Sequence, residues 1–169
     1  MHPFYLTNYN FCPRCGTKLK QNGDSLHCQQ CNFEIYANPA PTTTVFVIQN
    51  NQVLLAKRKI NPKKGTWDSP GGFVETGESI EAGAIREMKE ETNLDIKIVK
   101  IFGSHPDLYD NKPTVTIGVL AEIIGGKLTP GDDVASLHWV DLDKIPNEFG
   151  FKSVKLLLND LLKKIKQEA

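Results

Sequence analysis

All four cysteines of the chain lie within its first 31 residues, as two pairs of identical spacing. Cys12 and Cys15 form one Cys-x-x-Cys pair, Cys28 and Cys31 form the other, and twelve residues separate the pairs. Each pair can close a tight knuckle that presents two thiolates, and four thiolates are the ligand set of a structural zinc ribbon. Disulfide pairing is the alternative, and it requires an oxidising compartment. The spacing therefore predicts a tetrahedral site for zinc or a similar thiophilic metal.

Residues 1–40 are expected to be a small unit built around this metal. Aliphatic side chains are few in this segment, so it cannot bury enough apolar surface to fold without a cross-link or a metal. Asn22-Gly23 is a typical hairpin turn. Residues 38–41, Asn-Pro-Ala-Pro, indicate an extended linker, because each proline disfavours helix at the residue before it. The sequence thus predicts a zinc ribbon over residues 1–40 and a second domain over residues 41–169.

The second domain combines strand and helix patterns. Two β-branched, apolar runs flank Asn50-Asn51, which predicts a hairpin. A helix is expected next, with Ser79 as its cap and Asn93 in the left-handed conformation after its last turn. Apolar residues at three- and four-residue spacing near the C-terminus predict an amphipathic helix, which more often packs on its own sheet than binds a partner. The expected strands are 42–49, 52–59, 95–103, 114–124 and 137–140, and the expected helices are 79–91 and 151–165. Residues 61–69 are expected to be a polar loop, and Gly125-Gly126 is expected to be a turn.

The order of these patterns indicates the fold class. Strands and two helices without regular alternation favour an α+β sandwich. The composition, with 40% hydrophobic and 24% charged residues, is ordinary for a soluble globular protein. No apolar run approaches the roughly 20 residues that span a bilayer. The first ten residues lack the pattern of a secretory signal, so a cytoplasmic location is expected.

The balance of charge limits how the protein can bind an anion. Twenty basic and twenty acidic side chains give a formal net charge of +0, so no global field draws the protein to nucleic acid or to an anionic membrane. An anionic substrate must therefore be held by a local arrangement or by a metal ion.

Three glutamates cluster on the first helix of the second domain. Glu87, Glu90 and Glu91 fall within an arc of roughly 100°, and like charges placed this way destabilise a helix. Arg86 and Lys89 are expected to point in other directions. A hard cation such as Mg²⁺ or Mn²⁺, which prefers carboxylate and carbonyl ligands, would offset the repulsion. The alternative is a solvated charged face, which is the commoner interpretation of a glutamate-rich helix.

The residues around this cluster resemble a known signature. The residues that carry the resemblance are Gly72, Glu78, Arg86, Glu87, Met88, Glu90, Glu91 and Leu94, preceded by Pro70-Gly71-Gly72. This pattern resembles the Nudix hydrolase signature, with Asn93 in place of the usual glycine. Asparagine tolerates left-handed geometry, so the loop is expected to survive the change. A zinc ribbon ahead of such a domain resembles the subgroup that includes the NADH and ADP-ribose pyrophosphatases.

The resemblance implies a Nudix-type α/β/α sandwich with a mixed sheet and hydrolysis of the pyrophosphate bond in a nucleoside diphosphate linked to another group. It also implies that Glu87 and Glu91 ligate Mg²⁺ or Mn²⁺, with Glu90 assisting, while a backbone carbonyl of Gly71 or Gly72 joins them. The expected mechanism is metal-assisted attack of water on phosphorus, with a carboxylate removing the proton. The full set of expected site residues is Glu90, Glu91 and Arg86 for catalysis; Gly71, Gly72, Glu87, Glu90, Glu91 and Asp133 for the catalytic metal; Cys12, Cys15, Cys28 and Cys31 for zinc; and Glu75, Glu78, Phe46 and Tyr109 for substrate.

Two of these assignments have equal alternatives. Asp133 lies where many relatives carry a further acidic ligand, but it is also a turn aspartate in Pro-Gly-Asp-Asp. Phe46, His105 and Tyr109 are aromatic candidates for stacking on a base, and each is equally suited to ordinary packing or to the surface.

The substrate class stays open at this point. NADH pyrophosphatases carry a Ser-Gln-Pro-Trp-Pro-Phe-Pro-type stretch, whereas residues 104–109 here read Ser-His-Pro-Asp-Leu-Tyr. ADP-ribose, another dinucleotide or a nucleotide sugar therefore stands beside NADH, and a nucleoside triphosphate-sanitising pyrophosphatase is a second enzyme hypothesis. The rival class is a non-catalytic module that senses nucleotide while its ribbon binds RNA or protein. The complete set of glutamates and the neutral net charge disfavour it. Relatives are often dimers, so a homodimer is one expected assembly.

Overall fold

The structure is a computed structural model, and it describes residues 2–168. Its N-terminal part contains the short helix α1 (Pro3–Asn8) and the strands β1 (Lys20–Asn22), β2 (Ser25–His27) and β3 (Glu34–Tyr36). These strands form an antiparallel sheet in the order β1-β2-β3. The predicted hairpin at Asn22-Gly23 is confirmed, because Asn22 pairs with Ser25 and Gly23 has a positive φ of 57°. The buried core of this unit is small: Cys12, Leu19, Leu26 and Cys28.

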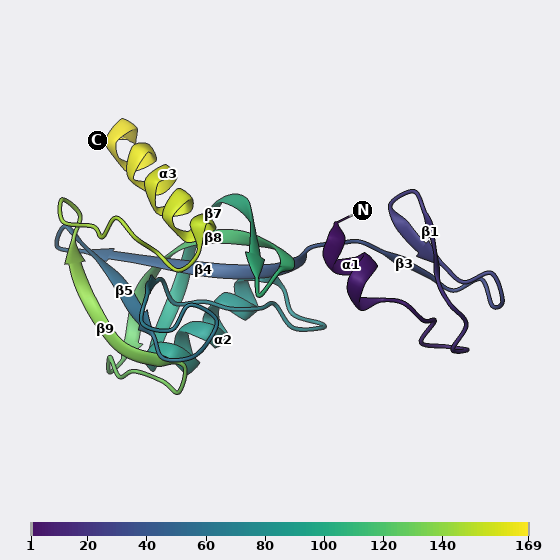
Figure 1. Ribbon diagram of the computed structural model, residues 1–169. Coiled ribbons are helices and arrows are strands. Elements are labelled where there is room, and N and C mark those ends of the chain that lie inside the picture. The colour runs from purple at the N-terminus through teal and green to yellow at the C-terminus, as the bar shows by residue number, and fades with distance from the viewer. Residues whose placement is uncertain (1, 169) are drawn as a thin grey trace.

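The rest of the chain is built on one large mixed sheet (Figure 1). Its strands are β4 (Ala40–Gln49), β5 (Gln52–Arg58), β6 (Trp67–Asp68), β7 (Leu94–Tyr109), β8 (Lys112–Gly126) and β9 (Val134–Asp141). The order is β6-β5-β4-β8-β7, and β9 pairs with β5. Strands β4 and β8 run parallel, whereas the other pairs are antiparallel. The expected α+β class with a mixed sheet is confirmed.

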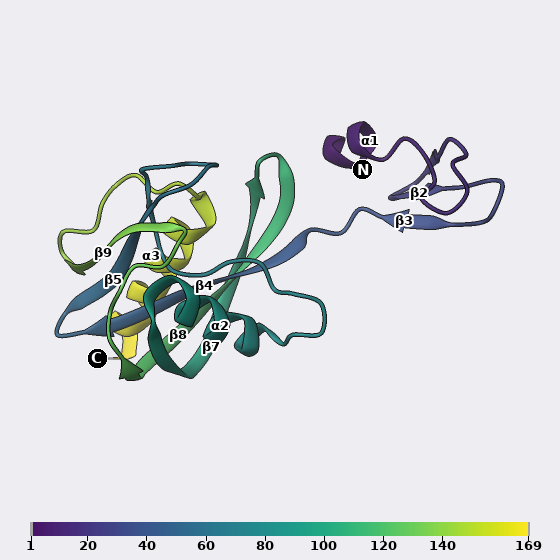
Figure 2. The same ribbon diagram turned by 90° about the horizontal axis from the view of Figure 1, so that it is seen from below.

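Two helices cover opposite faces of this sheet (Figures 1 and 2), α2 (Ile80–Thr92) on one side and α3 (Lys152–Glu168) on the other. Alternate residues of a strand point to opposite faces, so neighbours on β4 join different cores. Val45 and Val47 pack in the cluster that contains Met88 of α2. Phe46 packs in the cluster that contains Leu157 of α3. Strand β4 therefore lies between the two helices and contributes to both cores.

Local sequence signals set the ends of several elements as expected. Asn50 and Asn51 have φ values of 49° and 61°, the positive values that a tight two-residue hairpin turn requires. The Ser79 side chain accepts a hydrogen bond from the Ala82 amide at 3.1 Å, a cap worth about 1 kcal/mol. Asn93 ends α2 in the left-handed conformation, with φ 58° and ψ 17°.

Other elements differ from the sequence prediction. Strands β7 and β8 are longer than predicted, and they form a hairpin around Asp110 and Asn111, whose φ values are 47° and 66°. Gly125 and Gly126 are not a turn, since they pair with β7 as the last residues of β8. The loop predicted over residues 61–69 contains β6, and β9 is longer than its predicted core. Strand β9 is extended by pairing with β5, which is distant in sequence, whereas the added length of β7 and β8 comes from their own hairpin.

Across residues 2–168, no helix combines the length and the apolar character that crossing a bilayer requires.

Candidate functional site

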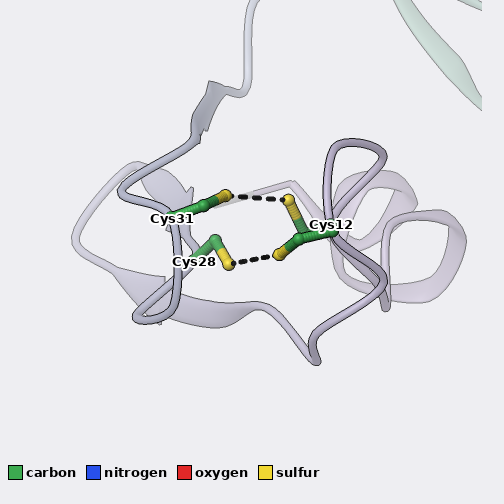
Figure 3. A group of neighbouring side chains, drawn as sticks. Cys12, Cys28 and Cys31 are labelled. Atoms are coloured by element: carbon green, nitrogen blue, oxygen red, sulfur yellow. Dashed lines mark hydrogen bonds between the residues drawn. The ribbon is translucent and has the colours of Figure 1, made fainter.

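The four cysteines meet at one point of the N-terminal unit. Their sulfur atoms all lie within 4.8 Å of one another. The sulfurs of Cys12 and Cys31 are 3.6 Å apart, and those of Cys15 and Cys28 are 3.5 Å apart. Figure 3 shows the labelled side chains of Cys12, Cys28 and Cys31 pointing toward this centre. All four are free thiols, so no disulfide links them.

This arrangement fits a zinc ion. With Zn–S bonds of about 2.3 Å, a tetrahedral site places its sulfurs about 3.8 Å apart. The backbone supports each knuckle, because the Gly16 amide donates to the Cys12 carbonyl and the Asn32 amide donates to the Cys28 carbonyl, both at 2.9 Å. Positive φ values at Gly16 and Asn32 close these turns. The cluster therefore has the donor set and the compactness of a structural zinc site.

A second group of candidate site residues lies where the loop after β6 meets α2. Gly72 packs so closely on Glu87 that an added Cβ atom at Gly72 would lie 2.4 Å from Glu87 Oε1. Glycine at this position therefore allows the glutamate to reach the loop backbone. The pKa of Glu87 is raised, mainly because its carboxyl is partly buried.

Arg86 ties the same loop to the helix. Its guanidinium donates to both carboxylate oxygens of Glu78, to Glu87 Oε1 at 2.8 Å and to the Phe73 carbonyl at 2.9 Å. It also donates to Glu90 Oε2 at 3.1 Å. The prediction that Arg86 points away from the glutamates is thus wrong, because a long arginine can curl back along its own helix. Lys89 does point elsewhere, to Asp95 at 2.9 Å.

Glu91 is anchored from the opposite side of the loop. The Gly71 amide donates to Glu91 Oε2 at 3.0 Å. Desolvation, together with the negative charges of Asp68 and Glu87, raises the pKa of Glu91 to about 8. Burial likewise raises the pKa of Asp68 to about 6, against the opposing effect of Arg58. These carboxyl groups are held close together with too little positive charge nearby.

The loop before β9 closes the C-terminal end of α2. The Gly131 amide donates to the Glu91 carbonyl and the Thr129 amide donates to the Thr92 carbonyl, both at 2.9 Å. A Cβ atom at Gly131 would lie 2.0 Å from the Glu90 carbonyl oxygen, so only glycine permits this approach. The contact brings Asp133, two residues further on, to the rim of the glutamate cavity.

These parts surround a cavity with a volume of about 220 Å³. It begins at Gly71, Gly72, Glu87 and Glu91 and continues to the start of α3. Its lining contains six carboxylates and a single cation, Arg58, among the described residues. Its lining includes Thr42, Thr43, Thr44, Arg58, Asp68, Gly71, Gly72, Phe73, Glu75, Glu87, Glu91, Asp107, Tyr109, Thr114, Thr116, Asp133, Phe151, Ser153 and Val154.

Aromatic side chains form one wall of the cavity near α3. Tyr109 stacks on Phe151 with ring centroids 5.7 Å apart, and its edge meets Phe73 at 5.2 Å. The Arg58 guanidinium lies over the Phe151 ring, 5.0 Å from its centroid. Strand β7, the loop after β6 and the segment just before α3 therefore each contribute one ring to this wall.

The structure gathers most, but not all, of the residues predicted from the sequence. Gly71, Gly72, Glu75, Glu87, Glu91, Tyr109 and Asp133 all line the cavity. Phe46 does not, because it is 0% exposed and packs against Phe102 in the core, so it cannot stack on a ligand. Glu90 and Glu78 lie outside the lining and bind Arg86. His105 bonds Asp160 of α3 at 2.7 Å instead of facing the cavity.

Three charged residues of the lining were missed by the sequence prediction. Arg58 binds Asp68 at 3.0 Å, and both lie beside Glu91. Asp107 accepts the Ser153 amide at 2.7 Å and so caps the start of α3. Arg58 ends a strand and Asp107 lies within one, so neither stands in a local motif. Asp68 directly precedes the Ser-Pro-Gly-Gly turn, and of the three residues only Asp68 could have been identified from its place in the sequence.

The glutamate end of the cavity fits a divalent cation. Within residues 2–168 only the cysteines converge to a single point, whereas Glu87, Glu91 and Asp133 border a shared space. The charged form of Glu91 is disfavoured by burial and by the charges of Asp68 and Glu87. A bound cation would favour that form, and hard oxygen donors are the ligands that Mg²⁺ and Mn²⁺ prefer. The Gly72 carbonyl already accepts the Thr43 amide at 2.8 Å, so Gly71 offers the simpler backbone ligand.

The sequence and the fold match known proteins over most of the chain. Residues 38–159 match the NUDIX domain. An ADP-ribose pyrophosphatase of Methanocaldococcus jannaschii is 39% identical over 116 residues, which are 68% of this chain and 69% of that protein. An NAD-capped RNA hydrolase NudC of Haemophilus influenzae is 34% identical over 145 residues, which are 83% of this chain and 54% of that protein.

A solved structure extends the likeness into the N-terminal unit. The crystal structure of a NUDIX hydrolase from Nitrosomonas europaea superposes with a TM-score of 0.78 at 27% identity. The match covers 92% of this chain and 91% of that chain. Because the match covers 92% of this chain, it must include part of residues 1–40. The Nitrosomonas europaea protein thus shares the fold of the large sheet and some of the unit ahead of it.

Proposed function

The chain belongs to the Nudix family, and from this premise we propose that it hydrolyses the pyrophosphate bond of a nucleoside diphosphate linked to another group. ADP-ribose and NADH are the substrate types that we favour. The relatives named ADP-ribose pyrophosphatase and NAD-capped RNA hydrolase support this choice. The chain spans about half the length of the NudC relatives, 54% in the Haemophilus influenzae protein, so the substrate is proposed for the site described here.

One observation carries the proposal. Glu87 and Glu91 of α2 and the backbone at Gly71 border the same cavity, which has six carboxylates and one cation in its lining. A site of this charge repels a diphosphate by itself. Divalent cations held by these carboxylates would offset the repulsion and favour binding of a diphosphate.

Each residue then has a defined task. We assign Glu87, Glu91, Asp133 and the Gly71 carbonyl as ligands of Mg²⁺ or Mn²⁺. When bound, such an ion neutralises charge on the phosphoryl oxygens and lowers the pKa of a water molecule. The Gly71 amide orients the Glu91 carboxylate, which lies at the cavity and is our candidate to remove a proton from the attacking water.

Two further residues act through their neighbours. Arg86 positions Glu87 and holds the loop through Glu78 and Phe73, so we assign it as a positioning residue. Glu90 lies outside the cavity and binds the same guanidinium. Its proposed task is to support Arg86 from the solvent side, and not to contact substrate.

For the N-terminal unit we propose a structural zinc ribbon over residues 1–40, followed by the catalytic domain over residues 41–169. Four thiolates complete a tetrahedral zinc, so no open position remains for substrate water. The zinc is therefore assigned to folding of the ribbon and not to the hydrolysis.

The proposal is tested with a panel of NADH, NAD, ADP-ribose, FAD, diadenosine compounds and nucleoside triphosphates, each with Mg²⁺ or Mn²⁺. The expected result is metal-dependent cleavage between the two phosphorus atoms, which releases AMP from ADP-ribose or NADH. Preference for nucleoside triphosphates would replace the proposed substrate class. Salt-sensitive RNA binding without turnover of any compound would contradict the enzyme assignment.

The matched variants are Glu91→Gln and Glu81→Gln. Glu91→Gln should reduce turnover by at least about a hundredfold while the fold is kept. Glu81 lies exposed in the first turn of the same helix, outside the cavity, so Glu81→Gln should retain turnover. Near-normal turnover of Glu91→Gln would refute the role assigned to this carboxylate.

A further inference from the structure

Two buried hydroxyl groups of the cavity lining, those of Thr43 and Thr44, have no hydrogen-bond partner among residues 2–168. Thr44 is 1% exposed, and its Oγ1 atom has no hydrogen-bond partner among residues 2–168. Burying a hydroxyl without a hydrogen bond is costly. Because Thr44 lines the cavity, a molecule bound there can supply the missing bond.

The direction of the Thr44 side chain follows from its strand. Thr42, Thr44 and Phe46 alternate along β4 and so share one face. The Thr42 hydroxyl donates to Thr116 Oγ1 at 3.1 Å, and Phe46 packs with Leu157 of α3. The Thr44 hydroxyl therefore lies on the α3 face of the sheet. Glu87 and Glu91 belong to α2 on the other face, and the cavity joins the two groups.

Neutral polar groups surround Thr44 on this face. Thr114, Thr116 and Ser153 add hydroxyls, and the Ser153 hydroxyl donates to Thr116 Oγ1 at 2.9 Å. The neighbour of Thr44 across the sheet is Gly118, which has no side chain to supply a bond. The hydroxyls of Thr42, Thr116 and Ser153 are thus paired with one another, whereas Thr44 is left for a ligand.

The charged groups of this region already have partners within the protein. The Asp107 carboxylate accepts the Ser153 amide, and Arg58 binds Asp68 while it lies over Phe151. What faces the ligand is a set of hydroxyls beside the rings of Tyr109 and Phe151. Such a surface suits an uncharged, ring-containing group with hydroxyl or amide functions, and it does not suit a phosphate.

We infer that Thr44 is a specificity residue that hydrogen-bonds the nucleoside part of the substrate in a subsite on the α3 face. This inference rests on the proposed function, because it places the diphosphate at the glutamate end of the same cavity. The nucleoside then extends past Thr43 and Thr44 toward the wall formed by Tyr109 and Phe151.

The first test measures the affinity of AMP and of inorganic pyrophosphate with Mg²⁺ by calorimetry. Thr44→Val keeps the shape of the side chain but removes the hydroxyl, so AMP should bind about tenfold more weakly. Pyrophosphate, which lacks a nucleoside, should bind within about twofold of wild type. Thr44→Ser keeps the hydroxyl and should retain AMP affinity. Unchanged AMP affinity in Thr44→Val, or an equal loss for pyrophosphate, would overturn the inference.

The second test measures the unfolding midpoint without ligand. Thr44→Val removes an unpaired buried hydroxyl and should raise the midpoint. Thr116→Val removes a hydroxyl that is bonded to Thr42 and Ser153, and should lower it. A lower midpoint in Thr44→Val would show that the hydroxyl has a partner inside the folded protein, which overturns its assignment to the ligand.

These tests stand apart from the hydrolysis assay, because AMP binding requires no turnover. Wild type that binds AMP but cleaves no compound of the panel contradicts the proposed function alone. If wild type hydrolyses ADP-ribose and Thr44→Val binds AMP as tightly as wild type does, the nucleoside subsite alone is contradicted.

Discussion

The Arg86 guanidinium donates two parallel hydrogen bonds to the Glu78 carboxylate, from Nε to Oε1 at 2.8 Å and from Nη2 to Oε2 at 3.0 Å. Such a bidentate pair has a fixed geometry as well as opposite charges. It joins the loop that carries Gly71 and Gly72 to the helix that carries Glu87 and Glu91. Together with the bond from the Gly71 amide to Glu91, this pair holds the loop against the helix.

We predict that Arg86→Lys lowers kcat/KM by about tenfold or more, the range typical of residues that orient metal ligands. Lysine keeps the charge but cannot form the fork to Glu78 and also reach Glu87 and Phe73. The concentration of Mg²⁺ that gives half-maximal activity should rise, which a loss of stability alone would not cause. Lys89→Gln is the matched control on the same helix, and it should behave like wild type. An unchanged Mg²⁺ requirement in Arg86→Lys would remove the positioning role.

The same pair predicts how stability depends on pH. Hydrogen bonds from Arg86 lower the pKa of Glu78 from 4.5 to about 2. A carboxyl group whose pKa is lowered by folding stabilises the folded state when the pH is above the ordinary pKa of that group. This contribution disappears as the pH falls toward 2. The difference in urea midpoint between wild type and Glu78→Gln should be constant above pH 5 and should shrink between pH 4.5 and 2. A difference that persists at the lowest pH would contradict this assignment.

Gly72→Ala should separate activity from stability. The added Cβ would lie 2.4 Å from Glu87 Oε1, and this oxygen is at the end of a flexible side chain. We expect the carboxylate to move aside, so that turnover falls by about tenfold or more while the melting temperature changes little. Gly103→Ala is a suitable control, because its Cβ would make an ordinary contact of 3.6 Å with Leu157. Wild-type turnover in Gly72→Ala would show that Glu87 need not approach the loop.

The cysteine cluster predicts one zinc equivalent per chain, measured by elemental analysis of the purified protein. Cys28→Ser should lose this zinc, and hydrogen exchange across residues 11–36 should become fast, because the small core around Cys12, Leu19 and Leu26 cannot fold alone. Exchange in the large sheet should stay slow. Ser25→Ala, a buried change in the same small sheet, should keep the zinc. A metal-free protein with a protected N-terminal unit would contradict the ribbon.

Some features could be predicted from the sequence because they depend on neighbours in the chain. The cap at Ser79, the left-handed Asn93 and the Asn50-Asn51 turn are determined by the conformations that these side chains permit. Asp110-Asn111 offered the same kind of signal for the turn between β7 and β8, and the prediction overlooked it. The expectation that the cysteines cluster also follows from spacing alone.

Strand partners could not be predicted in this way. Strand β9 pairs with β5 across some eighty residues, for example at Leu54 and Trp139, and β4 pairs in parallel with β8. Which strands pair depends on how the whole apolar surface is buried, and no single segment contains that information. The lengths of β7 and β8 were underestimated for a different reason, because the turn that joins them at Asp110-Asn111 was overlooked.

The sequence by itself determined the chemical groups of this protein: four thiolates at ribbon spacing, and Glu87 and Glu91 one turn apart on a helix. Only the tertiary structure decided which groups share a cavity. It placed Phe46 in the core, turned Arg86 back onto the glutamates, and brought Arg58, Asp68 and Thr44 beside them. Side-chain chemistry and local conformation are properties of neighbouring residues, whereas proximity across the sheet comes from packing that involves the whole domain.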